Sequence, residues 1–269
     1  MGFYFTTEKE LKDFLKSNNI TGAKAESFLS SFKNMKKRKD EYLKKLKNIK
    51  NYNQIKNIKI TDAQEIYFSS NVWDRSYYRK ILLEETFKPG LECVEVGVLK
   101  GDFSEILLSY NPKKLTLIDS WVCSEISGDK IYALEKGKLP QKDFDEDEKI
   151  VREKFKNDKR VQIIKAYSRD AVKKFKNESL DWVYIDTTHY YKAVLADLNN
   201  WMPKIKKGGY LCGDDFMIKD QHAFGVIEAV HAFLNLDELT LNSDNITHKK
   251  YGELKYKVIG QQYYIHKKL

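Results

Sequence analysis

The sequence is poor in cysteine and proline and contains no long apolar run. Its 269 residues include three cysteines and four prolines. An odd number of cysteines without metal-type spacing argues against a disulfide framework or a zinc site, so we interpret them as reduced structural thiols. No run of 18 apolar residues and no apolar signal-peptide segment occurs. We therefore expect neither membrane spanning nor secretion, and we predict a cytoplasmic protein.

Positive charge is in excess only near the N-terminus. Residues 1–60 carry 15 Lys and Arg against 6 Asp and Glu, whereas the remaining residues carry 33 of each sign. A basic segment can bind nucleic acid, but the solvated face of a helical appendage is the simpler interpretation. We accordingly predict a basic helical extension over residues 1–55, followed by one large domain over residues 56–269.

Two patterns indicate helices in this extension. Thr7 and Glu10 have the spacing of a capping box, ahead of a helix that should end near Ser17. Apolar side chains between residues 32 and 49 then recur three and four apart, as in a heptad stripe. Such a stripe packs either on its own domain or against a second subunit, and the sequence leaves both open. The second possibility predicts a homo-oligomer assembled through the N-terminal helices.

The most informative stretch runs from Glu92 to Asp119. Its first half reads as a buried strand that is broken by Gly97 and Gly101, after which a helical pattern begins. A second apolar run ends on Asp119, 22 residues after Gly97. This spacing is close to that of a nucleotide-binding βαβ unit, in which the acid takes the ribose hydroxyls. We therefore predict a nucleoside site with Asp119 on the ribose.

The glycine pattern argues against one class of ligand. A dinucleotide fingerprint requires Gly-x-Gly-x-x-Gly, because the backbone must approach a pyrophosphate closely. Here Val98 and Leu99 follow Gly97, and the middle glycine is absent. A pyrophosphate ligand is therefore not expected at this turn.

Two later strands should bring acidic side chains to the same edge. Residues 180–185 read as a buried strand that ends at Asp186, and residues 210–213 as another that ends at Asp214 and Asp215. Because parallel strands end at one edge of a sheet, the three carboxylates should lie close together and repel one another unless a cation holds them. Hard oxygen ligands favour Mg²⁺, with Mn²⁺ or Ca²⁺ as alternatives, over zinc, for which no Cys/His set exists.

Together these motifs resemble a known group of enzymes. The pattern Glu-x-Gly-x-x-x-Gly from Glu95 to Gly101 resembles the first motif of class I S-adenosyl-L-methionine (SAM) methyltransferases. The segments 185–190, 201–203 and 214–216, in that order, resemble the metal-dependent O-methyltransferases that include the macrolide-sugar enzymes and, more distantly, catechol O-methyltransferase. The resemblance covers residues 85–267, and Thr187 departs from it where glycine is common.

This resemblance implies a cofactor and a role for each site residue. The cofactor would be SAM, and its contacts would be Glu95, Gly97, Gly101, Asp119, Ser120 and Ser168. Ser168 lies where these enzymes contact the adenine, although a helix N-cap explains it equally well. The metal ligands would be Asp186, Asp214 and Asp215. His189 would be the general base beside Asp186, because a histidine accepts a proton near neutral pH.

The segment after Asp119 has the character of a lid. Residues 120–143 show no clear period, which makes them long for a loop in an α/β fold. A loop at the carboxyl end of a strand lies where open α/β sheets bind their ligands, so we predict a lid or a substrate-contacting insertion. Trp121 would either cover the adenine or pack under this loop.

The predicted fold is α/β, a Rossmann-like seven-stranded mixed sheet of the class I methyltransferase type with an α-helical N-terminal extension. Residues 225–234 should form its last helix, and residues 239–241 and 256–265 the final antiparallel pair of strands.

The predicted activity is SAM-dependent and divalent-metal-dependent O-methylation of a small hydroxylated acceptor. A sugar or a nucleotide sugar is the first choice of acceptor, and no membrane partner is expected. Two alternatives are open: an RNA methyltransferase guided by the basic helices, and a non-catalytic SAM-fold scaffold.

Overall fold

The computed structural model describes residues 8–17, 75–122, 141–216, 224–236 and 240–269, with a few positions between 19 and 37. Several predictions from the sequence lie outside these residues: the domain boundary near residue 55, most of the heptad stripe and most of the 120–143 lid. Within the described residues the first predicted helix is confirmed, as α1 (Glu8–Ser17).

The core of the fold is one eight-stranded sheet with the order β3-β2-β1-β4-β5-β8-β7-β6. The first five strands run parallel, and the last three are antiparallel to their neighbours. Their bounds are β1 (Glu92–Val96), β2 (Lys114–Asp119), β3 (Val161–Lys165), β4 (Leu180–Ile185), β5 (Ile205–Gly213), β6 (Asn242–His248), β7 (Gly252–Ile259) and β8 (Gln262–Lys267). The predicted Rossmann-like mixed sheet of the class I methyltransferase type is confirmed.

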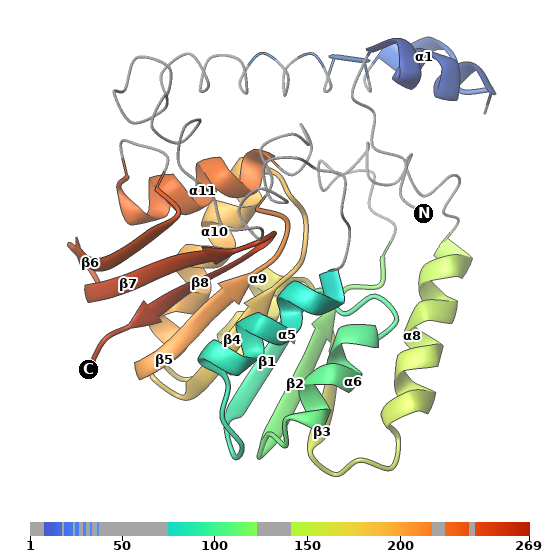
Figure 1. The fold of residues 1–269 in the computed structure, drawn as a ribbon. Helices are drawn as coiled ribbons and strands as arrows, with labels where there is room; N and C mark the ends of the chain where they lie inside the picture. The colour runs from blue at the N-terminus through green and yellow to red at the C-terminus, as the bar shows by residue number, and fades with distance from the viewer. Residues whose placement is uncertain are drawn as a thin grey trace.

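Helices cover both faces of this sheet (Figure 1). One face carries α5 (Arg75–Thr86), α6 (Asp102–Ser109) and α8 (Gln141–Phe155). The other carries α9 (Ser168–Ala171), α10 (Tyr191–Trp201) and α11 (Phe224–Leu234). Alternation along the strands supplies both cores: in β4, Trp182 packs toward the first face and Val183 toward the second. A sheet buried on both faces explains why its parallel strands read as continuous apolar runs.

The number of strands differs from the prediction. The run 256–265, expected as one strand, is divided at Gly260 into β7 and β8. Gly260 has φ +60°, and a Cβ at this position would lie 2.5 Å from the ring of Tyr78 on α5. The chain therefore turns here because a glycine permits both the left-handed backbone and the close helix. The strand predicted over residues 239–241 is found further along the chain as β6, which has a single buried residue, Ile246, and so carries no apolar run by which its position could be recognised.

The turn after β1 depends on the absence of a side chain at Gly97. This residue has φ +91°, and a Cβ placed on it would lie 1.8 Å from the backbone oxygen of Asp186. The end of β1 thus approaches the end of β4 more closely than any other residue type would allow. Gly90 has a similar φ of +84°, but a Cβ there would meet nothing within 4 Å.

We expect Gly97→Ala to destabilise the fold far more than Gly90→Ala. Both substitutions force a side chain into the left-handed region, at a cost of about 1–2 kcal/mol. Only Gly97→Ala also collides with backbone, which must then move, so its total cost should exceed about 4 kcal/mol. Chemical denaturation of both variants measures the difference. Equal losses of unfolding free energy would show that the β1–β4 approach is not tightly constrained.

Candidate functional site

The candidate site lies at the carboxyl edge of the parallel strands. Register places the ends of four strands side by side: Val96 pairs with both Ile118 and Ile185, and Ile185 pairs with Gly213. The residues that follow these positions are Gly97, Asp119, Asp186 and Asp214. The sequence motifs therefore meet at one edge, which is where open α/β sheets bind ligands.

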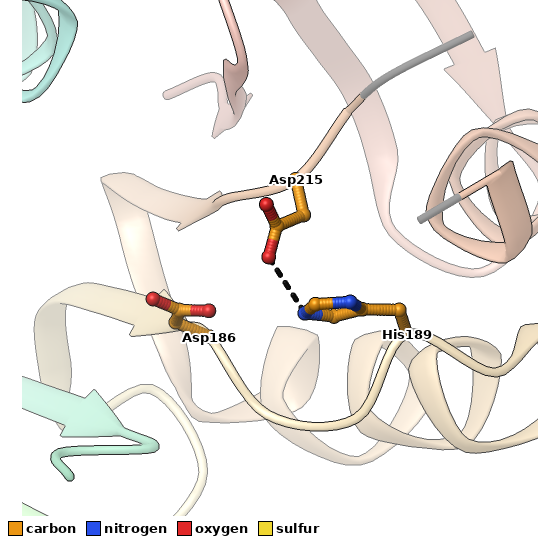
Figure 2. Close-up of side chains that lie close together, drawn as sticks. All are labelled: Asp186, His189 and Asp215. Carbon is orange, nitrogen blue, oxygen red and sulfur yellow. Dashed lines mark ion pairs between the residues drawn. The ribbon is translucent and has the colours of Figure 1, made fainter. Parts of the chain in front are cut away.

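Three of the predicted residues form a compact cluster. Asp186, His189 and Asp215 each offer a ligand atom, and these atoms all lie within 4.8 Å of one another (Figure 2). His189 Nε2 is 2.6 Å from Asp215 Oδ2, and both side chains are nearly inaccessible to solvent. A small hollow of about 10 Å³, roughly the room that one water molecule needs, opens beside them and is lined in part by Asp186, His189, Asp214 and Tyr263. The cluster thus combines hard oxygen donors, an imidazole and a small hollow.

Asp214 lies beside this cluster and, like Asp186, pairs with Arg79 of α5. Nη2 of Arg79 lies 2.6 Å from Asp214 Oδ2 and 2.7 Å from Asp186 Oδ2. Burial by itself would lower the pKa of Arg79, but Tyr184 and the two aspartates raise it well above its ordinary value, so the guanidinium stays charged. The positive charge beside the predicted carboxylates is therefore that of a protein side chain, the Arg79 guanidinium.

The sequence offered no signal for Arg79. It follows Tyr77 and Tyr78 and precedes Lys80 in the sequence, and a basic side chain is usually solvated. Only the packing of α5 on the sheet reveals its position. Its guanidinium carbon lies 4.6 Å from the centroid of the Phe103 ring, and its Nε donates a hydrogen bond of 3.1 Å to the Tyr184 hydroxyl.

Asp119 stabilises the glycine turn directly. Its Oδ2 accepts hydrogen bonds from the backbone N–H groups of Val98 (2.8 Å) and Leu99 (3.0 Å), and its Oδ1 accepts one from Trp121 (2.8 Å). The indole of Trp121 is fully buried and donates to the Leu99 carbonyl. Trp121 therefore packs against the glycine turn, and most of the loop under which it was expected to pack lies outside the described residues.

Glu95 and Gly101 fasten the helix that follows this turn. The Glu95 carboxyl is 2% exposed and accepts a hydrogen bond of 2.5 Å from Ser104 of α6. Gly101, the N-cap of α6, has φ +74°, and a Cβ there would lie 2.8 Å from the Phe155 ring of α8. Both predicted cofactor residues thus take part in holding α6 against the sheet and its neighbour.

Ser168 belongs to a polar network that links three elements. Its hydroxyl donates to Asp197 Oδ1 at 2.6 Å and accepts from the Trp201 indole at 2.9 Å. Asp197 also accepts a hydrogen bond from Thr187, which adjoins Asp186. The N-cap of α9 is Tyr167, so the alternative role of Ser168 as an N-cap is wrong. The remaining predicted contact, Ser120, is half-buried between Asp119 and Trp121.

The environment of Glu95 yields a test that depends on pH. Burial raises the pKa of Glu95 from an ordinary value of 4.5 to about 8, although the Ser104 hydrogen bond opposes this shift. The folded protein therefore retains a proton that the unfolded chain releases, and the stability from this proton is full below pH 4.5 and is lost as the pH rises to 8.

We expect Glu95→Gln, which cannot ionise, to become steadily more stable relative to wild type between pH 4.5 and 8. The slope of the difference should be at most about 1.4 kcal/mol per pH unit. Urea denaturation of both proteins at several pH values measures it. A constant difference across this range would mean that Glu95 is already ionised in the folded state.

Comparison with known proteins bears on the same part of the chain. The sequence model of the family described as "Methyltransferase domain" matches residues 94–216, which include the glycine turn and all three aspartates. No curated protein is significantly similar in sequence.

Several solved structures resemble this fold at low identity. A Corynebacterium glutamicum protein is 13% identical, with a TM-score of 0.48, over 83% of this chain and 97% of that one. A candidate O-methyltransferase from Klebsiella pneumoniae is 12% identical, with a TM-score of 0.46, over 81% and 96% of the two chains. The N-methyltransferase NodS from Bradyrhizobium japonicum is 14% identical, with a TM-score of 0.42, over 74% and 97%. Likeness at this level says nothing about substrate.

Within the described residues, no helix is long and apolar enough to cross a membrane.

The order of the parallel strands, the glycine turn after β1 and the family match over residues 94–216 agree with one another. Residues 94–216 therefore match a methyltransferase domain, and the sheet that contains them has the class I methyltransferase fold.

Proposed function

We propose that this protein transfers the methyl group of SAM to a hydroxyl oxygen of a small acceptor, with a sugar or nucleotide sugar as the acceptor class. The observation that carries the proposal is the convergence of Asp186, His189 and Asp215 at the carboxyl edge, next to the Gly97 turn. An O-methyltransferase needs a group that takes the hydroxyl proton and positive charge beside the oxygen that becomes negative. His189 at this edge can take the proton, and the aspartates can bind a cation that supplies the positive charge.

The proposed SAM site consists of the turn and the strand ends around it. The cofactor would pass the turn that contains Gly97 and Gly101, and Asp119 and Ser120 lie at the end of β2, where the ribose is expected. Glu95 acts from beneath by fastening α6. Ser168, at the start of α9, is the proposed contact on the adenine side.

The donor set fits a divalent cation. Asp186, Asp214 and Asp215 carry three negative charges and Arg79 carries one positive charge, which leaves a net charge of minus two. Carboxylate oxygens are the ligands that Mg²⁺ and Mn²⁺ prefer. When bound, such a cation supplies positive charge next to the acceptor oxygen.

His189 is the proposed proton acceptor. Its imidazole borders the hollow, and Nε2 faces the Asp215 carboxylate at 2.6 Å. A proton taken up by the imidazole makes it an imidazolium, which the neighbouring carboxylate stabilises. Asp215 also fixes the orientation of the ring, so the pair acts as a base with its own counter-charge.

Isothermal calorimetry with SAM is the first test of this function. We expect SAM to bind in a one-to-one ratio, and NAD not to bind, because the turn lacks the glycine that a pyrophosphate requires. Binding of NAD without binding of SAM would overturn the assignment, whatever the acceptor is.

The second test separates the base from the cation, once an acceptor has been found by screening nucleotide sugars. We expect His189→Ala to lower kcat by about 10²- to 10⁴-fold, with partial recovery at higher pH, where the acceptor hydroxyl loses its proton more readily. EDTA should abolish wild-type turnover, and Mg²⁺ should restore it. His266→Gln is the control, because His266 stacks on Tyr210 at the far end of β8. Undiminished turnover of both the His189 variant and the chelated enzyme would exclude this chemistry.

A further inference from the structure

Both oxygens of the Asp214 carboxylate are bound by neighbouring groups. Asp214 is fully buried, with a side-chain exposure of 0%. Its Oδ1 accepts hydrogen bonds from Gln262 Nε2 (2.6 Å) and from the backbone N–H of Asp215 (2.7 Å), and its Oδ2 is paired with Arg79. Asp186, by contrast, is 20% exposed and points toward His189 and Asp215 (Figure 2).

Arg79 is itself held from several sides. The ring of Phe103 lies under its guanidinium, and the Tyr184 hydroxyl accepts from its Nε. That hydroxyl donates in turn to Gln262, whose amide binds Asp214. Arg79, Asp214, Gln262 and Tyr184 therefore form a closed ring of hydrogen bonds. For Asp214 to bind a metal ion instead, several charged or buried hydrogen bonds would have to break at once, each of which is costly to leave unmade.

We propose that Arg79 is a positioning residue that divides the three carboxylates between two cations. Arg79 forms ion pairs with Asp214 and with one oxygen of Asp186. The divalent cation is held by Asp186 and Asp215 alone. This inference rests on the proposed function, which does not decide how many of the aspartates bind the metal. It makes Asp214 a partner of Arg79 instead of a metal ligand.

Charge and coordination both support this division. Arg79 neutralises one of the three negative charges, and the remaining two match a divalent cation. Two carboxylates with water or substrate oxygens are the usual ligand set of Mg²⁺, which keeps much of its hydration. Asp214 is also absent from the cluster of ligand atoms that lie within 4.8 Å of one another.

The test is a cycle of variants in which Mn²⁺ affinity is measured by calorimetry. Asp214→Asn and Asp215→Asn are compared in the wild-type protein and in Arg79→Met. In the wild-type background, we expect Asp215→Asn to weaken Mn²⁺ binding at least about tenfold more than Asp214→Asn, because only Asp215 is a ligand. In the Arg79→Met background Asp214 no longer pairs with Arg79 and can bind the metal. The loss of Mn²⁺ affinity caused by Asp214→Asn should therefore be at least about tenfold larger there than in the wild-type background.

Two controls complete the design. Arg79→Lys keeps the charge and should bind Mn²⁺ nearly as the wild type does, whereas Arg79→Met should bind it more tightly. If Arg79→Met does not fold, because its removal leaves buried carboxylates without a counter-charge, the comparison of the two Asn variants in the wild-type background decides alone.

The possible results separate this inference from the function on which it rests. The proposed role of Arg79 is overturned if Asp214→Asn lowers Mn²⁺ affinity as much as Asp215→Asn does. It is also overturned if Asp214→Asn lowers Mn²⁺ affinity equally in both backgrounds. Neither result contradicts the metal-dependent reaction. A wild-type protein that binds SAM but no Mn²⁺ overturns the metal-dependent mechanism, and the division of carboxylates with it.

Discussion

The candidate site depends on the close approach of two strand ends. The turn after β1 lies against the backbone of Asp186 because Gly97 has no side chain. This contact sets the first residue after β4 directly beside the glycine turn, and Asp119 accepts two backbone hydrogen bonds from that turn and one from Trp121. The cofactor side and the acid side of the proposed active site are therefore parts of one rigid edge.

Buried charge is the second constraint on this edge. Arg79 reaches the strand ends from α5, which precedes β1 and lies outside the segment matched by the methyltransferase family. A guanidinium enclosed by aromatic rings and carboxylates retains its charge. The helix before the domain's first strand thus contributes to the electrostatics of a site built from β4 and β5. Truncated versions of the chain that begin at β1 would lack this contribution.

Two other acids show how the fold uses buried carboxyl groups for position. Burial raises the pKa of Glu95 to about 8 and that of Asp197 to about 6. Each has hydroxyl partners that tie separate elements together: Ser104 joins α6 to β1, and Ser168 and Thr187 join α9 and the end of β4 to α10. These groups cost stability when they ionise, and they hold in place the loops around the proposed cofactor and metal.

The sequence by itself determined the fold class, the glycine turn and the arrival of Asp119, Asp186, Asp214 and Asp215 at one edge, since these follow from local apolar periodicity and the parallel direction of the strands. It did not reveal the position of β6, whose residues are mostly exposed, or the division at Gly260, which depends on contact with Tyr78. The tertiary structure alone decided that Arg79 faces the aspartates and that Asp214 is bound by Arg79 and Gln262. Such pairings join residues more than 100 positions apart, as Arg79 and Asp186 are, and no local pattern encodes which way a buried side chain will turn.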